Sequence, residues 1–413
     1  MGVRPGYKQT DVGVIPNEWE VTPMSELLTE FRGGAPLKPS DFTRTGVKIL
    51  PKGGVGRTGW LSIEEDNLQY CAQSYAATHR NNQVDWSFTI VVLRDLVPSG
   101  PSIGLMVQIR ESETYVLAQG VYGFKLNEKA DSRYLIQQSN TRWYRQIMNS
   151  IMVGSTQVHI TNTAFRRARV PLPPPAEQRA IADALGDVDA LLGALDRLIA
   201  KKRDLKQAAM QQLLTGQTRL PGFHGEWEVK RFGEVAFPRR DRVDPGSAGV
   251  QDFCIELEHI ASASGELLGS TSTGGQSSLK SVFRTGDVLF GKLRAYLRKY
   301  WLATRSGVCS TEVWVFAPKD RLVTTAFLFQ LIKTDEFIEA ASNSYGTHMP
   351  RSDWNIVKNY EFKLPPLPEQ AVISEVLAEI DAELSALDQR RSKTRALKQA
   401  MMQELLTGRT RLV

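Results

Sequence analysis

Residues 172–220 read LPPPAEQRAIADALGDVDALLGALDRLIAKKRDLKQAAMQQLLTGQTRL, and residues 364–412 read LPPLPEQAVISEVLAEIDAELSALDQRRSKTRALKQAMMQELLTGRTRL. The chain therefore carries one 49-residue segment twice, at a shift of 192 residues, with 28 identical positions and no gap. Chance does not produce such a match, and an internal repeat of this kind indicates two copies of one structural plan.

Each copy predicts a long helix with one apolar seam. Between Ala176 and Leu214 there is no proline, and apolar residues recur at intervals of four and three, the spacing of a coiled coil. The seam positions are Ile181, Leu185, Val188, Leu192, Leu195 and Ile199 in the first copy, and Ile373, Leu377, Ile380, Leu384, Leu387 and Arg391 in the second. We expect each helix to begin after the prolines and to end at Gly216 or Gly408. Because a helix with one apolar stripe needs a partner, the two copies are predicted to pack antiparallel; two unrelated surface helices are the alternative.

The segment that precedes each copy varies more. Glu18-Trp19-Glu20-Val21 recurs as Glu226-Trp227-Glu228-Val229, at a shift of 208, so the first unit holds 16 additional residues between about Val21 and Val121. We read Trp19 and Trp227 as core anchors. The domains expected from this comparison are 1–170, a first variable domain; 171–221, the central helix; 222–362, a second variable domain; and 363–413, the C-terminal helix.

The variable domains are predicted to be mixed α/β. Segments rich in β-branched and aromatic residues predict strands, at 87–93, 115–126, 287–290 and 308–316. Short helices are expected within 134–152 and 324–342. Polar segments are expected as loops, at 38–59, 73–83, 239–249 and 265–280, and these differ most between the two units.

Composition excludes several classes of protein. The 413 residues are 42% hydrophobic and 23% charged, as in soluble globular proteins, and no stretch approaches the ~20 apolar residues of a membrane helix. Cys71, Cys254 and Cys309 lie far apart in no disulfide or metal spacing. We therefore expect a cytoplasmic protein without a membrane partner. The net charge of +6 permits a polyanion such as DNA as a partner.

No catalytic motif is evident. The Pro-Pro pairs follow leucines instead of forming the Asn/Asp-Pro-Pro-aromatic tetrad of adenine methyltransferases, and no Gly-x-Gly-x-x-Gly turn is present. The five histidines form no ligand cluster. We expect a non-catalytic chain with no metal and no cofactor of its own.

Three kinds of segment are candidates for contact with DNA bases and phosphates. Two matched turns at 154–159 and 346–351 contribute Ser155, Thr156, Gln157, His159, Thr347, His348 and Arg351. A stretch read as a strand alternates basic and aromatic residues: Lys292, Arg294, Tyr296, Arg298 and Lys299. Polar loops contribute Lys52, Arg57, His79, Arg80, Asn81, Asn82, Arg239, Arg240 and Arg242. Ordinary capping turns and solvated charged surfaces are the alternative interpretations.

These motifs together resemble the specificity (S) subunit of type I restriction-modification systems, over essentially the whole chain. The resemblance is carried by Thr10-Asp-Val-Gly-Val-Ile-Pro-Asn-Glu-Trp19, by Leu-Pro-Pro-x-x-Glu-Gln before each helix, by the repeated Leu-Lys-Gln-Ala, and by Leu-Leu-Thr-Gly-x-Thr-Arg-Leu at each helix end. It implies an α/β fold with two target recognition domains separated by an antiparallel coiled coil.

The resemblance also implies a function in anti-phage defence. Each recognition domain would bind one half of a split, asymmetric site in double-stranded DNA, and the helices would set the gap and dock two methyltransferase subunits. Those subunits would bring S-adenosylmethionine, and restriction/translocase subunits would bring ATP and Mg. Arg390 and Arg391 replace Leu198 and Ile199, so the two helices need not contact partners identically. Two alternatives remain: a DNA-recognition subunit serving a non-methylating partner, and a structural adaptor whose variable domains bind protein.

Overall fold

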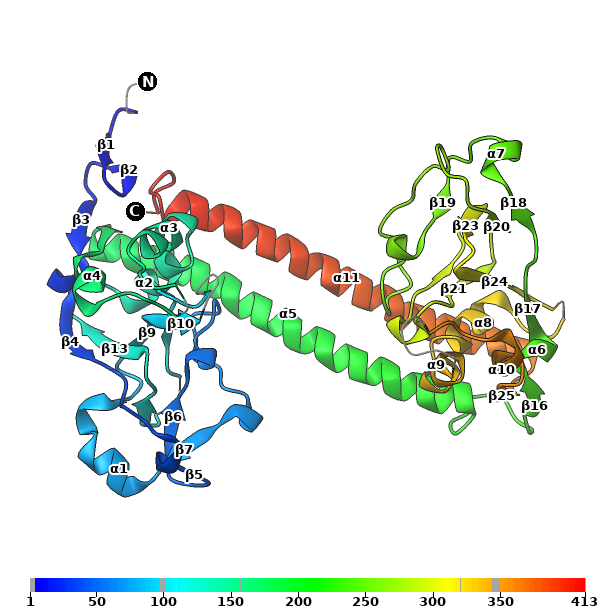
Figure 1. The fold of residues 1–413 in the computed structure, drawn as a ribbon, viewed down its shortest axis with the longest axis horizontal. Helices are drawn as coiled ribbons and strands as arrows, with labels where there is room; N and C mark the ends of the chain where they lie inside the picture. Colours follow the sequence, from blue (N-terminus) through cyan, green and yellow to red (C-terminus); the bar gives the residue numbers. More distant parts are fainter. Residues whose placement is uncertain are drawn as a thin grey trace. The chain divides into compact units, whose positions relative to one another are not determined.

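The computed structural model describes residues 4–96, 101–110, 112–155, 157–319, 321–343 and 350–412. It divides into two compact units: residues 1–196 with 390–413, and residues 197–389. Each unit combines a mixed α/β globule with part of both long helices, α5 (Pro175–Thr215) and α11 (Leu367–Leu405) (Figure 1). Within the described residues, no helix is long and apolar enough to span a bilayer.

The first unit contains two larger sheets. Its four-stranded sheet has the order β11-β9-β13-β4 (Met106–Gln108, Thr89–Val92, Val121–Leu126, Leu28–Arg32). Its five-stranded sheet has the order β5-β7-β6-β12-β8 (Phe42–Thr43, Gln69–Cys71, Val47–Leu50, Tyr115–Leu117, Gln83–Val84). Three strand pairs complete it: β1 (Tyr7–Thr10) with β2 (Gly13–Pro16), β3 (Glu20–Pro23) with β15 (Arg169–Leu172), and β10 (Arg94–Leu96) with β14 (Gln157–His159). The short helices are α1 (Gln73–Thr78), α2 (Ser132–Ser139), α3 (Arg142–Ser150) and α4 (Asn162–Arg167).

The second unit repeats this plan. Its sheet β17-β24-β21-β22 (Ala236–Pro238, Val313–Pro318, Val288–Gly291, Tyr300–Leu302) has the strand order of β4-β13-β9-β11. Its other sheet has the order β18-β20-β23-β19 (Arg242–Val243, Lys280–Phe283, Gly307–Ser310, Cys254–Ile255), and β16 (Glu228–Arg231) pairs with β25 (Glu361–Leu364). The short helices are α6 (Phe232–Val235), α7 (Pro245–Ala248), α8 (Thr325–Leu331), α9 (Asp335–Ser342) and α10 (Trp354–Val357).

One difference between the units lies in the region of unequal length. In the first unit β12 lies between β6, which is parallel to it, and β8, which is antiparallel. In the second unit β23 lies between β19 and β20 in the same senses. The first unit adds β7 and β5 beyond β6, inside the region where the sequence comparison places 16 additional residues.

The two long helices run antiparallel in each unit, as predicted. In the first unit Asp189 pairs with Lys398 and Asp196 with Arg391. In the second unit Lys206 pairs with Asp381, and Lys202 pairs with Glu383. Since the residue numbers rise along one helix as they fall along the other, these pairs fix the antiparallel direction.

The first apolar seam residues of each long helix are buried in the core of the globule in which that helix begins. Ile181 and Leu185 are fully buried in the core of the first unit, where Leu405 and Leu406 from the end of α11 join them. In the second unit Ile373 and Leu377 meet Leu213 and Leu214 from the end of α5, along with Met210. The beginning of each repeated segment therefore packs against the end of the other copy.

A buried glutamate marks each of these junctions. In the first unit the indole Nε1 of Trp19 donates to Glu177 Oε2 at 3.0 Å, and the guanidinium of Arg411 binds the same carboxylate through two nitrogens. In the second unit Trp227 donates to Glu369 at 3.0 Å, and Arg219 binds that carboxylate through two nitrogens at 2.7 Å each. Neither glutamate is exposed to solvent. This triad gives a physical reason for the repeated Glu, Trp and Thr-Arg-Leu.

The glutamine that follows each glutamate holds the next loop of the globule. The Gln178 amide accepts from Asp131 N at 2.8 Å and donates to the carbonyls of Lys129 and Pro173. The Gln370 amide accepts from Thr324 N at 2.8 Å and donates to the carbonyls of Leu322 and Pro365. Each glutamine thus places the N-terminus of a short helix, α2 or α8.

Both helix ends occur where the sequence predicts them. Gly216 follows α5 with φ at 71°, and Gly408 follows α11 with φ at 69°. A Cβ on Gly408 would lie 2.5 Å from Pro16, so this close approach also requires glycine.

Several secondary-structure predictions were wrong in detail. The segments 115–126 and 308–316 each contain two strands, because a turn at 119–120, where Gly120 has φ 90°, and a turn at 311–312 lead the chain from one sheet to the other. The helical regions are each divided in two by an N-capping threonine, Thr141 or Thr334. Segments expected as loops contain the strands β5, β6 and β18 and the short helices α1 and α7. The pairing of such strands across a sheet is not visible in local sequence.

Candidate nucleic-acid interface

The segment 292–299 forms a hairpin loop instead of the predicted strand. Phe290 of β21 pairs with Tyr300 of β22, so the chain must reverse between them. It does so through a 3₁₀ turn, Ala295–Leu297, flanked by Arg294 and Arg298 in left-handed conformations at φ 55° and 51°. A left-handed non-glycine residue costs ~1–2 kcal/mol, which the surrounding contacts must offset.

This hairpin lies against Arg351, which the sequence analysis placed in a separate group. Arg294 N donates to Pro350 O at 2.9 Å, and Ser352 N donates to Lys292 O at 2.8 Å. Arg351 Nε donates to Glu312 Oε2 at 2.9 Å, and this hydrogen bond raises the pKa of the guanidinium. The structure therefore brings the basic–aromatic stretch and one predicted turn residue to one edge of the second unit.

Within this group, some side chains face solvent and others hold the hairpin together. Tyr296 is 55% exposed, Arg294 is exposed and Lys292 is half-buried, with no ion pair to any of them in the described part of the chain. Arg298, by contrast, binds Asp335 and the carbonyl of Lys333. The Lys299 amine donates to two carbonyls, at 2.6 and 2.8 Å.

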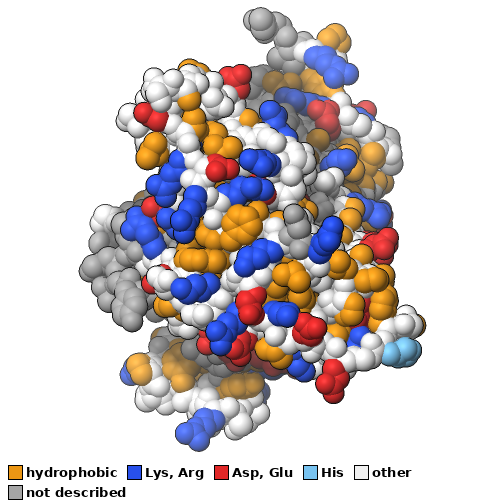
Figure 2. Space-filling view, turned by 90° about the vertical axis from the view of Figure 1, so that its right-hand side faces the viewer, with side chains coloured by type: hydrophobic (Ala, Val, Ile, Leu, Met, Phe, Trp, Pro, Cys, Tyr) orange, Lys and Arg blue, Asp and Glu red, His pale blue; other side chains and the backbone are white. Residues whose placement is uncertain are grey.

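The basic run 239–242 is divided in the same way. Arg239 binds the buried carboxylate of Asp287 through Nε at 2.7 Å and a terminal nitrogen at 2.9 Å, so its guanidinium is committed to the fold. Arg240 and Arg242 are exposed, with no ion pair among the described residues. Lys and Arg side chains are interspersed with apolar ones over the face seen in Figure 2.

The first unit places its predicted loop residues on separate short elements. The His79 ring stacks on Tyr75 at 4.0 Å, and the Asn82 amide donates to Gly33 O at 2.8 Å, so both hold the loop in place. Of the other loop residues, Lys52 is half-buried, and three are exposed: Arg57, Arg80 and Asn81.

The matched turns are described only in part. Ser155 and Gln157 are exposed, while His159 is half-buried and its backbone pairs with Val153. Thr156, Thr347 and His348 lie outside the described residues.

The sequence analysis missed one group in the first unit. Trp60, Trp86, Gln108 and Arg110 line a hollow beside the four-stranded sheet. The signal available in the sequence was Asp85-Trp86-Ser87, a tryptophan between polar residues, which is unusual for a core position.

Comparison with known families assigns this architecture. The sequence model for the type I restriction modification DNA specificity domain matches residues 16–201 and 261–394, which is most of the chain. The chain belongs to the type I specificity subunit family. The match covers most of the first globule, the second globule from residue 261 onward and most of both long helices, so the S-subunit resemblance seen in the sequence motifs is confirmed.

Two relatives carry the same family description. The type I restriction enzyme MjaVIII specificity subunit of Methanocaldococcus jannaschii is 24% identical over 215 residues, covering 52% of this chain and 49% of that protein. The type I restriction enzyme EcoDI specificity subunit of Escherichia coli is 26% identical over 251 residues, covering 52% of this chain and 56% of that protein. The chain spans about half the length of the curated relatives it matches.

A solved structure shows the same fold. The crystal structure of the type I restriction-modification S subunit from M. genitalium aligns with 98% of each chain, at a TM-score of 0.61 and 11% sequence identity. The mixed α/β S-subunit fold predicted from the repeat is therefore confirmed.

Proposed function

We propose that this chain gives a type I restriction-modification complex its DNA sequence specificity, with each globule binding one half of a split, asymmetric site. The observation that carries the proposal is the repeated anchoring of the two globules. Both are held by a buried Glu–Trp–Arg triad at the start of a long helix. Two globules that are anchored in the same way but expose different side chains are suited to binding two different half-sites.

The exposed groups have the chemistry that DNA reading needs. Arginine and lysine bind phosphates, Gln pairs with adenine and Arg with guanine in the major groove. In the second unit the candidates are Lys292, Arg294, Tyr296, Arg240 and Arg242, joined by Arg351. In the first unit they are Lys52, Arg57, Arg80, Asn81, Ser155 and Gln157. Arg351 stays in the contact set although it binds Glu312, because its side chain is 49% exposed. We leave out the half-buried residues whose side chains bind groups of the fold: Arg239, Arg298, Lys299, His79 and Asn82.

The proposal assigns no catalysis to this chain. Two methyltransferase subunits would dock on the helix pair and bind S-adenosylmethionine, and restriction/translocase subunits would use ATP and Mg. The helix pair would set the number of base pairs between the half-sites.

Modified-base sequencing of host DNA, with and without the gene, tests the reading function. We expect a split motif of methylated adenines that disappears on deletion. An unchanged methylome in a host that expresses an active methyltransferase partner would contradict the proposal and favour a partner of another kind.

A second experiment tests the spacing role. Seven residues would be inserted after Asp196, together with seven in the facing part of α11, so that the seam keeps its phase. Seven helical residues add ~10 Å, which is the length of about 3 base pairs. We expect a longer gap between unchanged half-sites; recovery of the original gap would show that the helices do not set the spacing.

A further inference from the structure

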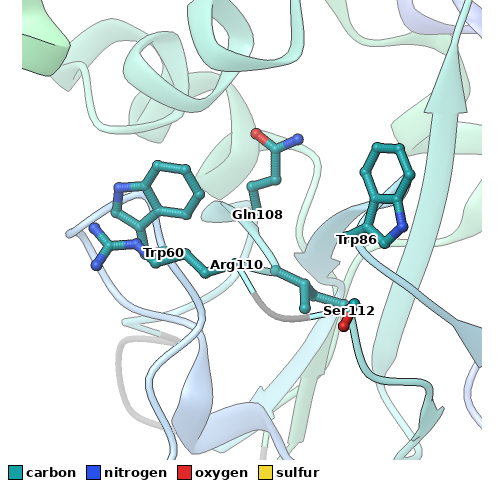
Figure 3. Close-up of a pocket in the computed structure, with 6 residues that line it drawn as sticks. Trp60, Trp86, Gln108, Arg110 and Ser112 are labelled. Carbon is teal, nitrogen blue, oxygen red and sulfur yellow. The ribbon is translucent and has the colours of Figure 1, made fainter.

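A hollow on the first unit is built around two tryptophans. It is a shallow hollow that is largely open to solvent, with a volume of about 740 Å³, and it is lined by Trp60, Trp86, Gln108, Ile109, Arg110 and Ser112. Figure 3 shows the two indoles on opposite sides, with the Gln108 amide standing between them.

The fold holds these side chains in place from the backbone. Gln108 ends β11, where it pairs with Thr89 of β9, and its backbone bonds to Gly59 and Leu61 on either side of Trp60. Trp86 lies in a turn in which Asp85 Oδ1 accepts from Ser87 N at 2.9 Å. The Arg110 guanidinium lies over the Trp60 ring, 4.3 Å from its centroid.

Several polar side-chain groups face the hollow. Among the described residues, no hydrogen bond or ion pair involves the side chains of Gln108 or Arg110, or either indole N–H. Trp86 is 59% exposed, so its ring presents a face to solvent. Two other cations of the first unit, Arg32 and Lys125, do have an ion-pair partner, because both pair with Glu30. Among the described residues, stacking on Trp60 is the contact that orients Arg110.

We propose that this hollow binds one unstacked adenine base of the DNA, with its face on Trp86 and its edge on Gln108. The inference rests on the proposed function and names a binding site within it. A glutamine amide offers the donor–acceptor pair that matches adenine N7 and N6. The unpaired charge of Arg110 suits the phosphate next to that base.

The energetics permit such a site. Unstacking a base costs least where the base is unpaired. Stacking on an aromatic side chain and a bidentate contact to the base edge each offset part of that cost. Asp85 precedes Trp86 in the chain, and its hydrogen bonds to Ser87 lower the pKa of that carboxyl. Its charge is directed into the turn.

The test uses the full chain and end-labelled duplexes that are identical except at one position. That position is fully paired, an unpaired adenine, or an unpaired thymine. Binding is followed by fluorescence anisotropy at low ionic strength, where non-specific binding is measurable. A duplex with unpaired 2-aminopurine reports stacking through quenching. The variants are Trp86→Ala and Gln108→Leu, with Phe42→Ala as the control, since Phe42 is an exposed aromatic of the same unit outside the hollow.

We expect the wild-type chain to bind the unpaired-adenine duplex about tenfold more tightly than the paired duplex and to quench 2-aminopurine. Trp86→Ala should abolish both effects, Gln108→Leu should abolish only the preference for adenine over thymine, and Phe42→Ala should change neither. Equal binding of paired and unpaired duplexes, or an unchanged preference in Trp86→Ala, would overturn this inference while leaving the proposed function intact. Failure to bind any duplex would overturn both.

Discussion

Corresponding half-buried carboxylates of the helix pair have different partners in the two units. Asp189 of the first unit accepts from the Gln137 amide at 2.8 Å and pairs with Lys398. Asp381, its counterpart 192 residues on, pairs with Lys206 and with the buried amine of Lys333 at 2.9 Å. One unit thus uses a neutral amide where the other buries a charge. The difference teaches that the repeated helices fix the junction, while each globule supplies its own complement.

The largest expected effect comes from removing a triad glutamate. Glu177→Ala should destabilise the first unit by about 3 kcal/mol, because it leaves the fully buried Trp19 indole without a partner and leaves Arg411 with only the exposed carboxylate of Glu18. Glu369→Ala should cost less, since Trp227 is half-buried and can be hydrated. Calorimetry of both variants checks the order. Glu18→Ala is the control, because that exposed partner of Arg411 should contribute little; equal losses for all three would disprove the role of burial.

Two arginines of the second unit should separate stability from DNA affinity. Arg239→Ala leaves the buried Asp287 carboxylate without its cation and should cost about 2–3 kcal/mol of stability. Arg294→Ala should leave stability unchanged and weaken DNA binding. If one phosphate contact is lost, the slope of the logarithm of the binding constant against the logarithm of the salt concentration should become shallower by about 0.9. Thermal melts and binding titrations at several salt concentrations distinguish the two; the reverse pattern would exchange their roles.

The buried amine of Lys333 should make the stability of the second unit depend on pH. Burial lowers the pKa of Lys333 to about 8, against the opposing effect of Asp381. Above that pH the folded chain has released a proton that the unfolded chain keeps until about pH 10.5, so stability rises with pH across this window. Lys333→Gln should remove the rise, changing stability relative to wild type by about 2 kcal/mol between pH 7.5 and pH 10. The converse variant Gln137→Lys should introduce a rise in the first unit, and two parallel pH profiles would contradict this account.

The smallest effects should distinguish the half-sites. Gln157→Ala in the first unit and Arg351→Ala in the second should each relax one position of one half of the motif, by about 1 kcal/mol. Sequencing of the methylome for each variant checks this. Loss of specificity in both halves from one substitution would show that the units do not read independently.

The repeat predicted the bounds of the long helices, because the signals for helix starts and ends are local in the sequence. The helix bounds follow from the prolines, the seam spacing and the glycines, and all of these act within a few turns. The partner of each triad could not be predicted in the same way. Arg411 and Glu177 are separated by 234 residues, so nothing near either residue shows their contact.

The recognition surfaces were less predictable for a different reason. Local composition made 292–299 look extended, yet sheet pairing on both sides forces a turn there. Composition also could not distinguish the role of Arg239, which binds Asp287, from that of Arg240, which is exposed. The Trp60–Trp86 hollow assembles residues from three segments around a sheet edge and was therefore missed.

The division into units has a consequence for the order of folding. The second unit is one continuous segment, residues 197–389, whereas the first is completed only by residues 390–413. Chains emerge from the ribosome N-terminus first, and domains generally fold as units. The Glu369 triad is complete once Glu369 has been synthesised, but the Glu177 triad must wait for Arg411. The globule made first is therefore the one whose fold closes last.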